Sequence, residues 1–412
     1  MAENKENVRR LTTTGTHQPL RIAHVITRLI NGGADENTVI SCNQAVRSGH
    51  SVMLVHGAQT RPEILAAVDA RVEIVELRSL VQPIAPLSDM KALGDLVRTF
   101  RRHRPDVVHT HTSKAGILGR LAARAARVPV LVHGVHIVPF VNVGQLERHA
   151  YLTAERAVQR MTHAFIDVSP AVRDLCVGAG VGAAERHHVV PSGFDLSVFR
   201  NATAPEDWRD LLRLRPGDPR PPVVVMLAVF EPRKRHLECL ERLPRIVARF
   251  AEARFVLAGD GRLRNDIEAR IRTLGIERNV VLTGFHPHPE QLIALADLCL
   301  LASEREGLPR VLMQYLAGGK PVIAADLPCI DDVLRDGVNG LVIRSDLHGL
   351  ADVVIALLDD PARRAELTRG AAATELSEWD ATRMGERLEA VYAAVIRERM
   401  PQRMPRRREA VT

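Results

Sequence analysis

The sequence contains few aromatic residues, since Phe, Tyr and Trp together make up 3% of its 412 residues. Proteins that bind single-stranded nucleic acids stack the bases on aromatic side chains. Because such side chains are sparse, we expect no nucleic-acid partner, although the formal net charge is +7. Much of this charge lies at one end of the chain, where six arginines crowd the C-terminus: Arg397, Arg399, Arg403, Arg406, Arg407 and Arg408.

Cysteines and long apolar runs are scarce as well. No run approaches the roughly 18 apolar residues of a membrane span, and residues 1–18 lack the apolar core of a signal peptide. We therefore expect a cytoplasmic protein that is at most peripheral on the inner face of the cell membrane. The cysteines are odd in number, widely spaced and set in apolar surroundings, which favours buried free thiols over disulfides or zinc ligands. They are Cys42, Cys176, Cys239, Cys299 and Cys329.

Short runs of β-branched residues alternate with segments of helical periodicity along the whole sequence. This alternation is typical of parallel sheets built from βαβ units, and the length allows two domains. We therefore predict an α/β protein with two doubly wound, Rossmann-like halves. The predicted strands span residues 20–26, 51–55, 72–77, 106–110, 129–133 and 164–168 in the first half, and 222–228, 254–258, 280–283, 298–302, 321–324 and 340–343 in the second.

The boundary between the halves is predicted at residues 191–195, a turn-forming segment that precedes a polar stretch. The N-terminal domain then spans residues 19–195 and the C-terminal domain residues 196–379. Apolar residues at helical spacing predict a last helix, residues 380–400, which we expect to pack back on the N-terminal domain. We expect residues 1–18 and the basic tail 401–412 to be disordered.

Residues 303–326, SEREGLPRVLMQYLAGGKPVIAAD, resemble the signature of glycosyltransferase family 4. In that family a Glu-Gly turn opens a helix, a second Glu follows eight positions later, and a Gly-x-Pro-Val-Ile-Ala strand comes next. The resemblance implies a retaining glycosyltransferase with the GT-B fold, in which two Rossmann-like domains face each other across a cleft. It also implies a nucleotide-sugar co-substrate without a metal or another cofactor, and the sequence contains no Asp-x-Asp motif.

The resemblance places the donor sugar on Glu306, as a catalytic residue, and the diphosphate at the helix start formed by Gly307, Leu308, Pro309 and Arg310. A helix N-terminus offers free backbone N–H groups to an anion. Gln314 stands where the family has a second Glu that reaches the ribose. Its amide keeps an acceptor oxygen, so it can still bind a diol, without the assistance of a charge.

Residues 226–236, MLAVFEPRKRH, resemble the first strand and turn of the nucleotide domain. Lys234 occupies the position of a lysine that contacts the diphosphate, and a cation there stabilises the departing nucleotide. Val229 stands where the family has an arginine. Arg233 and Arg235 are the nearby cations that could compensate, and we assign Arg233 to the donor site.

Two turns resemble further parts of the donor site. Gly259 and Gly261 form a strand-end turn in which glycine permits close approach of the backbone. Gly284 and Phe285 match the segment that lies against the nucleotide base in the family.

In the N-terminal half, Gly32 and Gly33 resemble the family's Gly-Gly-Ala-Glu loop, an anion-friendly loop after the first strand. We expect them to face the cleft, with His111, Ser113 and Lys114 on the acceptor side. His136 fits the position of a catalytic histidine near the reacting sugar. His109 and His111 would share one face of a strand, but no third ligand follows at a recognisable spacing, so we expect no metal site.

These residues predict transfer of a sugar from a UDP- or GDP-sugar to a saccharide or lipid-linked acceptor, in the synthesis of cell-surface polysaccharide or another glycoconjugate. A basic helix around residues 98–104 and the C-terminal arginines could bind an anionic membrane surface. The alternatives are a nucleotide-sugar 2-epimerase and a non-catalytic GT-B subunit that binds a nucleotide or a partner. A NAD-dependent dehydrogenase is disfavoured because Gly259-Asp-Gly261 lacks the third glycine of its fingerprint.

Overall fold

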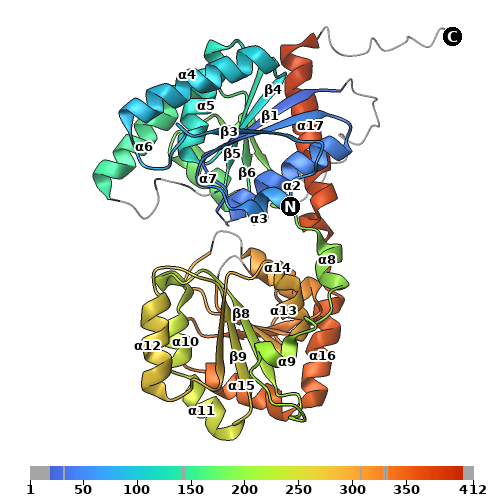
Figure 1. Ribbon diagram of the computed structural model, residues 1–412. Coiled ribbons are helices and arrows are strands. Elements are labelled where there is room, and N and C mark those ends of the chain that lie inside the picture. The colour runs from blue at the N-terminus through green and yellow to red at the C-terminus, as the bar shows by residue number, and fades with distance from the viewer. Residues whose placement is uncertain are drawn as a thin grey trace, which may run out of the picture. The chain divides into compact units, whose positions relative to one another are not determined.

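The computed structural model describes residues 19–30, 33–136, 138, 140, 144–306, 309–327, 330 and 333–401. The chain divides into two compact units, Met1–Phe194 with Glu378–Thr412, and Asp195–Ser377. Each unit is a parallel sheet covered by helices on its two faces (Figure 1). The expectations for residues 1–18 and for all of the basic tail beyond residue 401 lie outside the described residues.

The first unit is built on a sheet of seven parallel strands in the order β3-β2-β1-β4-β5-β6-β7. Its central strands are buried along their whole length, as parallel strands covered on both faces must be. The strands are β1 (Arg21–Ile26), β2 (Ser51–Gly57), β3 (Glu73–Leu77), β4 (Val107–His111), β5 (Val130–Val135), β6 (Ala164–Asp167) and β7 (His187–Val189).

The two faces of this sheet carry separate apolar layers. Ile22 and Ile26 point to the layer made with α2 and α17, whereas Ala23 and Val25 point to the layer made with α4 and α5. Side chains alternate between the faces along a strand, so His24 lies on the α2 and α17 side. The helices are α2 (Gly33–Arg47), α3 (Pro62–Ala66), α4 (Pro86–His103), α5 (Ser113–Ala125), α6 (Gln145–Val158), α7 (Pro170–Gly178) and α17 (Ala381–Arg399).

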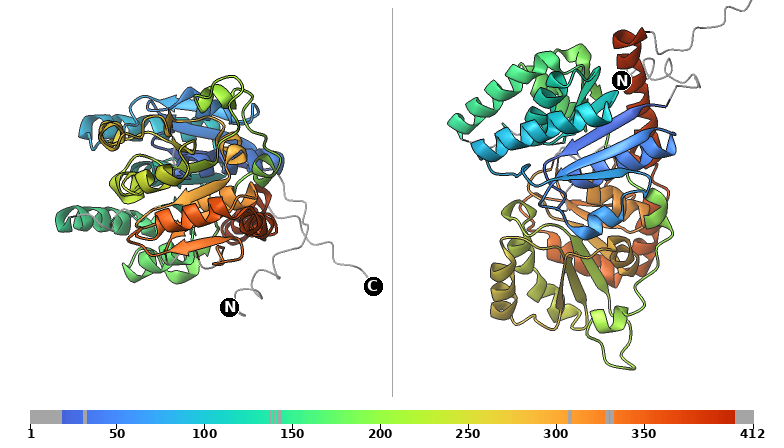
Figure 2. Two further views of the ribbon diagram at one scale, coloured as in Figure 1. Left: turned by 90° about the horizontal axis from the view of Figure 1, so that it is seen from below. Right: turned by 45° about the horizontal axis from the view of Figure 1, so that its top comes forward.

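Helix α17 belongs to the first unit although it comes last in the sequence. Its Met384, Leu388 and Tyr392 join the apolar layer of α2, and Figures 1 and 2 show it running beside the strands of this unit. Its start is fixed by the Asp380 side chain, which accepts a hydrogen bond from the Thr382 backbone N–H.

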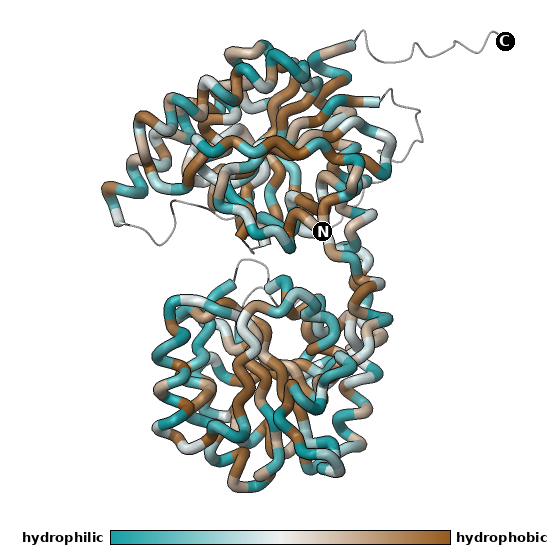
Figure 3. Tube along the Cα trace, viewed as in Figure 1, coloured by the Kyte–Doolittle hydropathy of each residue, from teal (hydrophilic) through white to brown (hydrophobic). Residues whose placement is uncertain are grey.

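The second unit contains six parallel strands in the order β10-β9-β8-β11-β12-β13. One face carries a large apolar layer that includes Val224 and Met226 of β8, and the alternate residues Val223 and Val225 are buried on the other face. Apolar residues concentrate on its strands and polar residues on the outer sides of its helices (Figure 3). The strands are β8 (Val223–Leu227), β9 (Arg254–Ala258), β10 (Val280–Gly284), β11 (Leu298–Leu301), β12 (Val322–Ala325) and β13 (Gly340–Ile343). The helices are α8 (Leu196–Arg200), α9 (Trp208–Leu211), α10 (His236–Leu240), α11 (Leu243–Arg249), α12 (Arg264–Leu274), α13 (Pro289–Leu295), α14 (Arg310–Ala317), α15 (Leu350–Asp359) and α16 (Pro361–Ala372).

The strand order reverses once in each sheet, between β1 and β4 in the first unit and between β8 and β11 in the second. The helices on either side of such a point leave in opposite directions, which opens a crevice at the carboxyl ends of the strands where ligands bind. These two edges are therefore the places to look for a site.

The predicted α/β fold with two parallel sheets is confirmed, and every predicted strand is present within two residues of its expected ends. One strand was missed: β7 has three residues, two of them histidines, and carries no apolar alternation. Cys42, Cys176, Cys239 and Cys299 are buried free thiols as predicted, and Cys329 lies outside the described residues. In the described parts of the chain, no helix has both the length and the apolar character needed to cross a membrane.

Candidate active site

Three loops at the carboxyl edge of the second sheet are joined by backbone hydrogen bonds. Ala228 N–H donates to Ala258 O (3.0 Å), and Phe230 N–H donates to Asp260 O (2.9 Å), so the loops after β8 and β9 run together. Gly259 N–H donates to Gly284 O (2.8 Å), which adds the loop after β10. These bonds fix the backbone of the site before any ligand arrives.

The two glycines of the β9 turn are required by the closeness of this packing. A Cβ on Gly259 would lie 1.9 Å from the Ala228 carbonyl oxygen, and one on Gly261 would lie 2.7 Å from the Phe230 carbonyl oxygen. Gly284 adopts φ 67°, a left-handed conformation that favours glycine. The half-buried Phe285 follows it at the same edge.

The carboxylate of Glu306, after β11, is the centre of this edge. It forms ion pairs with the Lys234 ammonium and with Arg233 Nη1 (3.3 Å), and it accepts a hydrogen bond from Ser303 Oγ (2.6 Å). The cations stand on η3 (Pro232–Lys234), the turn after β8, so these contacts cross the point where the strand order reverses. The Glu306 side chain is only 9% exposed, so these charges attract each other more strongly than a surface pair does.

The structure separates the two arginines that could compensate for Val229. Arg233 points to the site, where it also pairs with Glu231 (3.0 Å). Arg235 points elsewhere, donating to the Ser345 carbonyl oxygen and lying 3.6 Å from Glu238. Val229 itself is exposed at the end of the strand. Arg233 is therefore the second cation that this edge presents.

Helix α14 begins at Arg310 with Pro309 as its N-cap residue, and it carries the half-buried Gln314 on its second turn. Its buried Tyr315 hydroxyl accepts a hydrogen bond from the Leu227 backbone N–H (2.8 Å), which ties the helix to the end of β8. Gly307 and Leu308, which we assigned to the diphosphate, lie outside the described residues.

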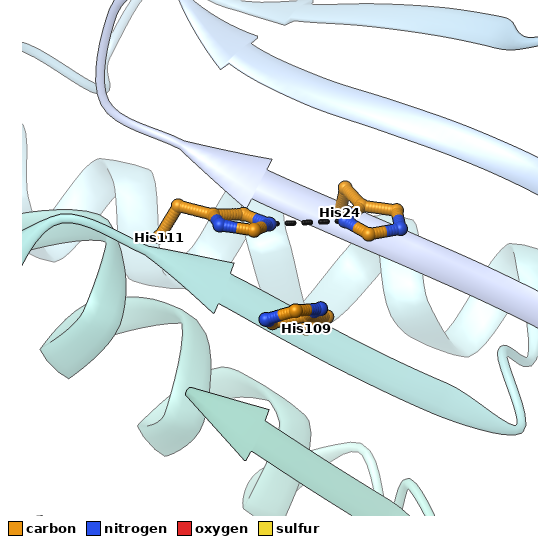
Figure 4. Close-up of side chains that lie close together, drawn as sticks. All are labelled: His24, His109 and His111. Carbon is orange, nitrogen blue, oxygen red and sulfur yellow. Dashed lines mark hydrogen bonds between the residues drawn. The ribbon is translucent and has the colours of Figure 1, made fainter. Parts of the chain in front are cut away.

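In the first unit, three buried histidines meet on one face of the sheet (Figure 4). His24 on β1 is paired in register with His109 on β4, and His111 lies two residues further along β4. His24 Nδ1 and His111 Nε2 are 3.0 Å apart. The three residues offer one ring nitrogen each within 4.8 Å of one another. The sequence showed only the two histidines of β4, and the sheet supplies the third.

His136, after β5, joins this cluster at the carboxyl edge. Its Nε2 is 2.9 Å from His111 Nδ1, and its Nδ1 is 3.4 Å from the amide nitrogen of the buried Asn37 on α2. The structure thus brings His136 and His111 together, as two members of the expected site. Of the glycine loop, Gly33 begins α2 and Gly32 lies outside the described residues.

Backbone strain marks the turn beside this cluster. Thr112 follows His111 and has φ 63° and ψ 164°, which is a costly conformation for a β-branched residue. Its hydroxyl is 3.1 Å from that of Thr27, whose oxygen also accepts from Ala115 N–H. Strain held in place in this way is found at functional sites.

The other two residues assigned to the acceptor side lie on the first turn of α5, beyond Thr112. Ser113 is half-buried. The ammonium of Lys114 forms an ion pair with Asp89 on α4 (2.5 Å) and donates to the Pro83 carbonyl oxygen. Lys114 therefore contacts helix α4 and the residues before it, and not the histidines.

Burial keeps the histidines of this cluster uncharged. It lowers the pKa of His24 to about 3, because a charged ring loses its hydration inside the protein. Burial also lowers the pKa of His109 and His111 well below the usual value, and the neighbouring histidines lower both further. Neutral imidazoles hydrogen-bond as one donor and one acceptor each.

Sequence reasoning did not identify His24, Asn37, Thr27 or Thr112. His24 and Thr27 stand in and after an apolar strand and match no motif. A positive φ at a threonine has no signature in sequence. Asn37 lies four residues after Gly33, so its place on the helix that follows the glycine loop was the only available signal.

Two families match most of the chain. Residues 221–360 match the glycosyl transferases group 1 family, and residues 32–193 match the glycosyl transferase 4-like domain. The second unit corresponds to the first of these families and the first unit to the other.

Curated relatives and a solved structure agree with this assignment. The chain is 31% identical to D-inositol 3-phosphate glycosyltransferase 1 of Catenulispora acidiphila, over 71% of this chain and 72% of the relative. It is 25% identical to the UDP-Gal:alpha-D-GlcNAc-diphosphoundecaprenol alpha-1,3-galactosyltransferase of Escherichia coli, over 84% of this chain and 89% of the relative. Anabaena Alr3699/HepE, solved in complex with UDP and glucose, shares the fold with a TM-score of 0.74 and 22% identity, over 91% of this chain and all of that one.

The packing of the β9 turn predicts a cost for adding one methyl group. Gly259→Ala would place Cβ against the Ala228 carbonyl oxygen, and we expect it to lower the free energy of unfolding of the second unit by about 1–3 kcal/mol. Gly349→Ala is the matched control, because a Cβ there meets no atom within 4 Å, and it should change stability by less than about 0.5 kcal/mol. Urea unfolding measures both, and equal effects would show that the turn is not tightly packed.

Proposed function

Since this chain belongs to the group 1 glycosyl transferases and has the GT-B fold of a transferase enzyme, we propose that it is a retaining glycosyltransferase. It moves a sugar from a UDP- or GDP-sugar to a saccharide or lipid-linked acceptor, in the synthesis of a cell-surface polysaccharide or another glycoconjugate. The observation that carries this proposal is the carboxylate of Glu306, which Lys234 and Arg233 hold at the point where the strand order of the second sheet reverses.

The ion pairs of Glu306 indicate how the second unit binds a nucleotide sugar. In the free protein, the carboxylate holds both cations in place. When a nucleotide sugar binds, its diphosphate attracts the ammonium and the guanidinium, and the carboxylate accepts hydrogen bonds from the sugar hydroxyls. The cations then stabilise the negative charge that develops on the departing diphosphate. Two cations perform this step without a metal ion in the proposed mechanism.

The remaining donor contacts come from the same edge. The start of α14, at Pro309 and Arg310, offers backbone N–H groups to a phosphate. Gln314 hydrogen-bonds the ribose, and the segment of Gly284 and Phe285 packs against the base. The backbone bonds between these loops hold the donor site in one conformation, so that little ordering is required when the donor binds.

We assign the acceptor to the first unit. His136 hydrogen-bonds the reacting sugar, and the glycine loop before α2 with His111 and Ser113 surrounds it. Lys114 contributes by orienting the start of α5 through its ion pair with Asp89. The strained Thr112 between β4 and α5 sets the direction in which this helix leaves the strand.

Helix α4 gives this enzyme a surface suited to a membrane. Its exposed residues Leu87, Met90, Lys91, Arg98 and Arg102 follow one another at helical spacing on a single face. Leu87 and Met90 are 84% and 71% exposed, and Ile84 just before the helix is 90% exposed. The face therefore starts apolar and ends basic, which matches the acyl region and the anionic headgroups of a bilayer. We propose peripheral binding through it, as a lipid-linked acceptor would require.

Removal of the Glu306 carboxylate tests the proposed activity. We expect Glu306→Gln to lower kcat/KM for sugar transfer by about 100-fold, because one transition-state contact and the anchor of two cations are lost. The measurement is release of UDP or GDP from a panel of nucleotide sugars with a saccharide acceptor. Glu304→Gln is the control, because this neighbouring carboxylate is exposed. Equal activity of the wild type and Glu306→Gln would contradict the assignment, and conversion of the donor without any acceptor would indicate an epimerase.

The role of Arg233 is tested by removing its guanidinium group and by placing a guanidinium group at position 229 instead. Arg233→Ala should lower kcat/KM by about 10- to 100-fold, and Arg235→Ala should lower it much less, because Arg235 points away from the site. Adding Val229→Arg to Arg233→Ala returns a guanidinium to the strand end and should restore a large part of the activity. An unchanged kcat/KM in Arg233→Ala would remove this arginine from the donor site.

Cosedimentation with liposomes tests the membrane surface. The double variant Leu87→Glu/Met90→Glu should bind vesicles of anionic lipid at least about tenfold more weakly, because two apolar side chains no longer enter the bilayer. Val338→Glu is the control, an exposed apolar residue of the second unit, and it should bind like the wild type. Binding that is equal for anionic and neutral vesicles, or insensitive to the double variant, would refute this surface.

A further inference from the structure

A line of four polar side chains runs through the apolar layer between the first sheet and its helices α2 and α17. It begins at His24 in the middle of β1, continues through His111 and His136, and ends at Asn37 on α2. The successive nitrogen–nitrogen distances are 3.0, 2.9 and 3.4 Å. Each of His111 and His136 uses one ring nitrogen for the residue before it and the other for the residue after it.

This line does not satisfy every buried polar atom that it contains. His24 and His111 are buried among the apolar residues of β1 and β4, where a polar group is unfavourable unless it is fully hydrogen-bonded. Within the described residues, His24 Nε2 has no hydrogen-bond partner, and neither has the Asn37 side-chain oxygen. An arrangement that leaves buried polar atoms unpaired calls for an explanation in function.

Asn37, at one end of the line, sets its direction. The Asn37 amide nitrogen can only donate, so His136 Nδ1 accepts and the proton of the neutral ring is on Nε2. His136 Nε2–H then donates to His111 Nδ1, which leaves the proton of His111 on Nε2. That N–H donates to His24 Nδ1. The tautomer of each ring therefore fixes the tautomer of the next.

We propose that His111 and His24 are positioning residues that hold His136 in the Nε2–H tautomer, so that its Nδ1 offers a lone pair to a hydroxyl group of the sugar. The inference rests on the proposed function, which puts a sugar beside His136. The contact of His136 with Asn37 is the longest of the line, and a sugar hydroxyl replaces it when the substrate binds. His136 Nδ1 then accepts a hydrogen bond from the sugar without any change in protonation.

The backbone opposite the line keeps room for it. Gly134 on β5 is in register with His111. A Cβ on Gly134 would lie 3.0 Å from His111 Nδ1 and 3.2 Å from His136 Nε2, the two nitrogens of the central hydrogen bond. A larger residue at position 134 would crowd these two nitrogens, together with His109 Nε2, which lies 3.2 Å from the same Cβ position. Burial lowers the pKa of His24 and His111 and keeps these two rings neutral, so that each has one donor and one acceptor nitrogen.

His109 is a matched control that the chain itself provides. It lies on the same strand and the same face as His111, it is equally buried, and its ring is 4.2 Å from that of His111. Its Nδ1 is 2.7 Å from the hydroxyl of Tyr392 on α17, so it stands outside the line. His109→Phe and His111→Phe remove the same buried group and differ in whether the line is broken.

The experiment measures the tautomer of His136 by long-range proton–nitrogen correlation NMR on the full chain labelled with ¹⁵N-histidine, with His136→Gln to assign the signals. The wild type should show the Nε2–H form, and His109→Phe should keep it. His111→Phe should shift the ring toward Nδ1–H, and His24→Phe should do so in part. His111→Asn should restore the wild-type form, since an amide oxygen can accept from His136 Nε2–H.

The same variants are assayed for transfer. His111→Phe should lower kcat by about tenfold with little change in KM for the donor, the loss expected for one misdirected hydrogen bond. His109→Phe should retain most of the kcat, because His109 pairs with Tyr392 outside the line. A wild-type His136 with its proton on Nδ1, or a tautomer that is unchanged in His111→Phe, would overturn the inference. So would a purified protein with one bound metal ion per chain that His24→Phe removes, because the nitrogens would then be ligands.

The NMR measurement separates this inference from the proposed function. It needs neither donor nor acceptor, so a wild type without transferase activity would refute the function while the tautomer still tests the line. An active wild type whose kcat is equal in His111→Phe would retain the function and refute the line.

Discussion

The candidate site of the second unit is organised by one electrostatic contact, in which the carboxylate of Glu306 holds the side chains of Lys234 and Arg233 across the point where the strand order reverses. The carboxylate comes from the loop after β11 and the cations from the turn after β8. A backbone bond from Glu304 N–H to the Arg233 carbonyl oxygen (2.8 Å) closes the same junction. The contact therefore joins the two halves of the sheet at the edge where a parallel sheet presents its ligands.

This contact also bears on position 229, where the family resemblance predicts an arginine and the chain has a valine. Val229 leaves the end of β8 without a charge, and Arg233 reaches the same carboxylate from the next turn. Its guanidinium is paired with Glu231 as well, so it is held in position although the side chain is 35% exposed. An ordered cation requires less reorganisation when a diphosphate binds than a free surface arginine would.

The sequence predicts the strands well and the contacts between them less well. The apolar runs of β8 and β9 are almost entirely buried and are readily recognised as strands, whereas the short β7 contains too few apolar residues to be recognised. Glu306 and Lys234 were found through motifs, and their ion pair was not. The same holds for His24, because the pairing of β1 with β4 joins residues 85 positions apart in sequence. Sequence periodicity gives the face of a residue but not its neighbour in the adjacent strand.

The two units carry different side chains at the point where the strand order of each sheet reverses: charged groups in the second unit and neutral imidazoles in the first. The second unit gathers a carboxylate and two cations, which suits a charged diphosphate that leaves with more negative charge than it arrived with. The first unit gathers imidazoles, and burial keeps them neutral. A neutral ring can orient a hydroxyl group by hydrogen bonding alone, without a formal charge. Hydrogen-bond direction takes the place of charge in this half, and the buried line of histidines carries that direction from Asn37 on α2 to His24 on β1.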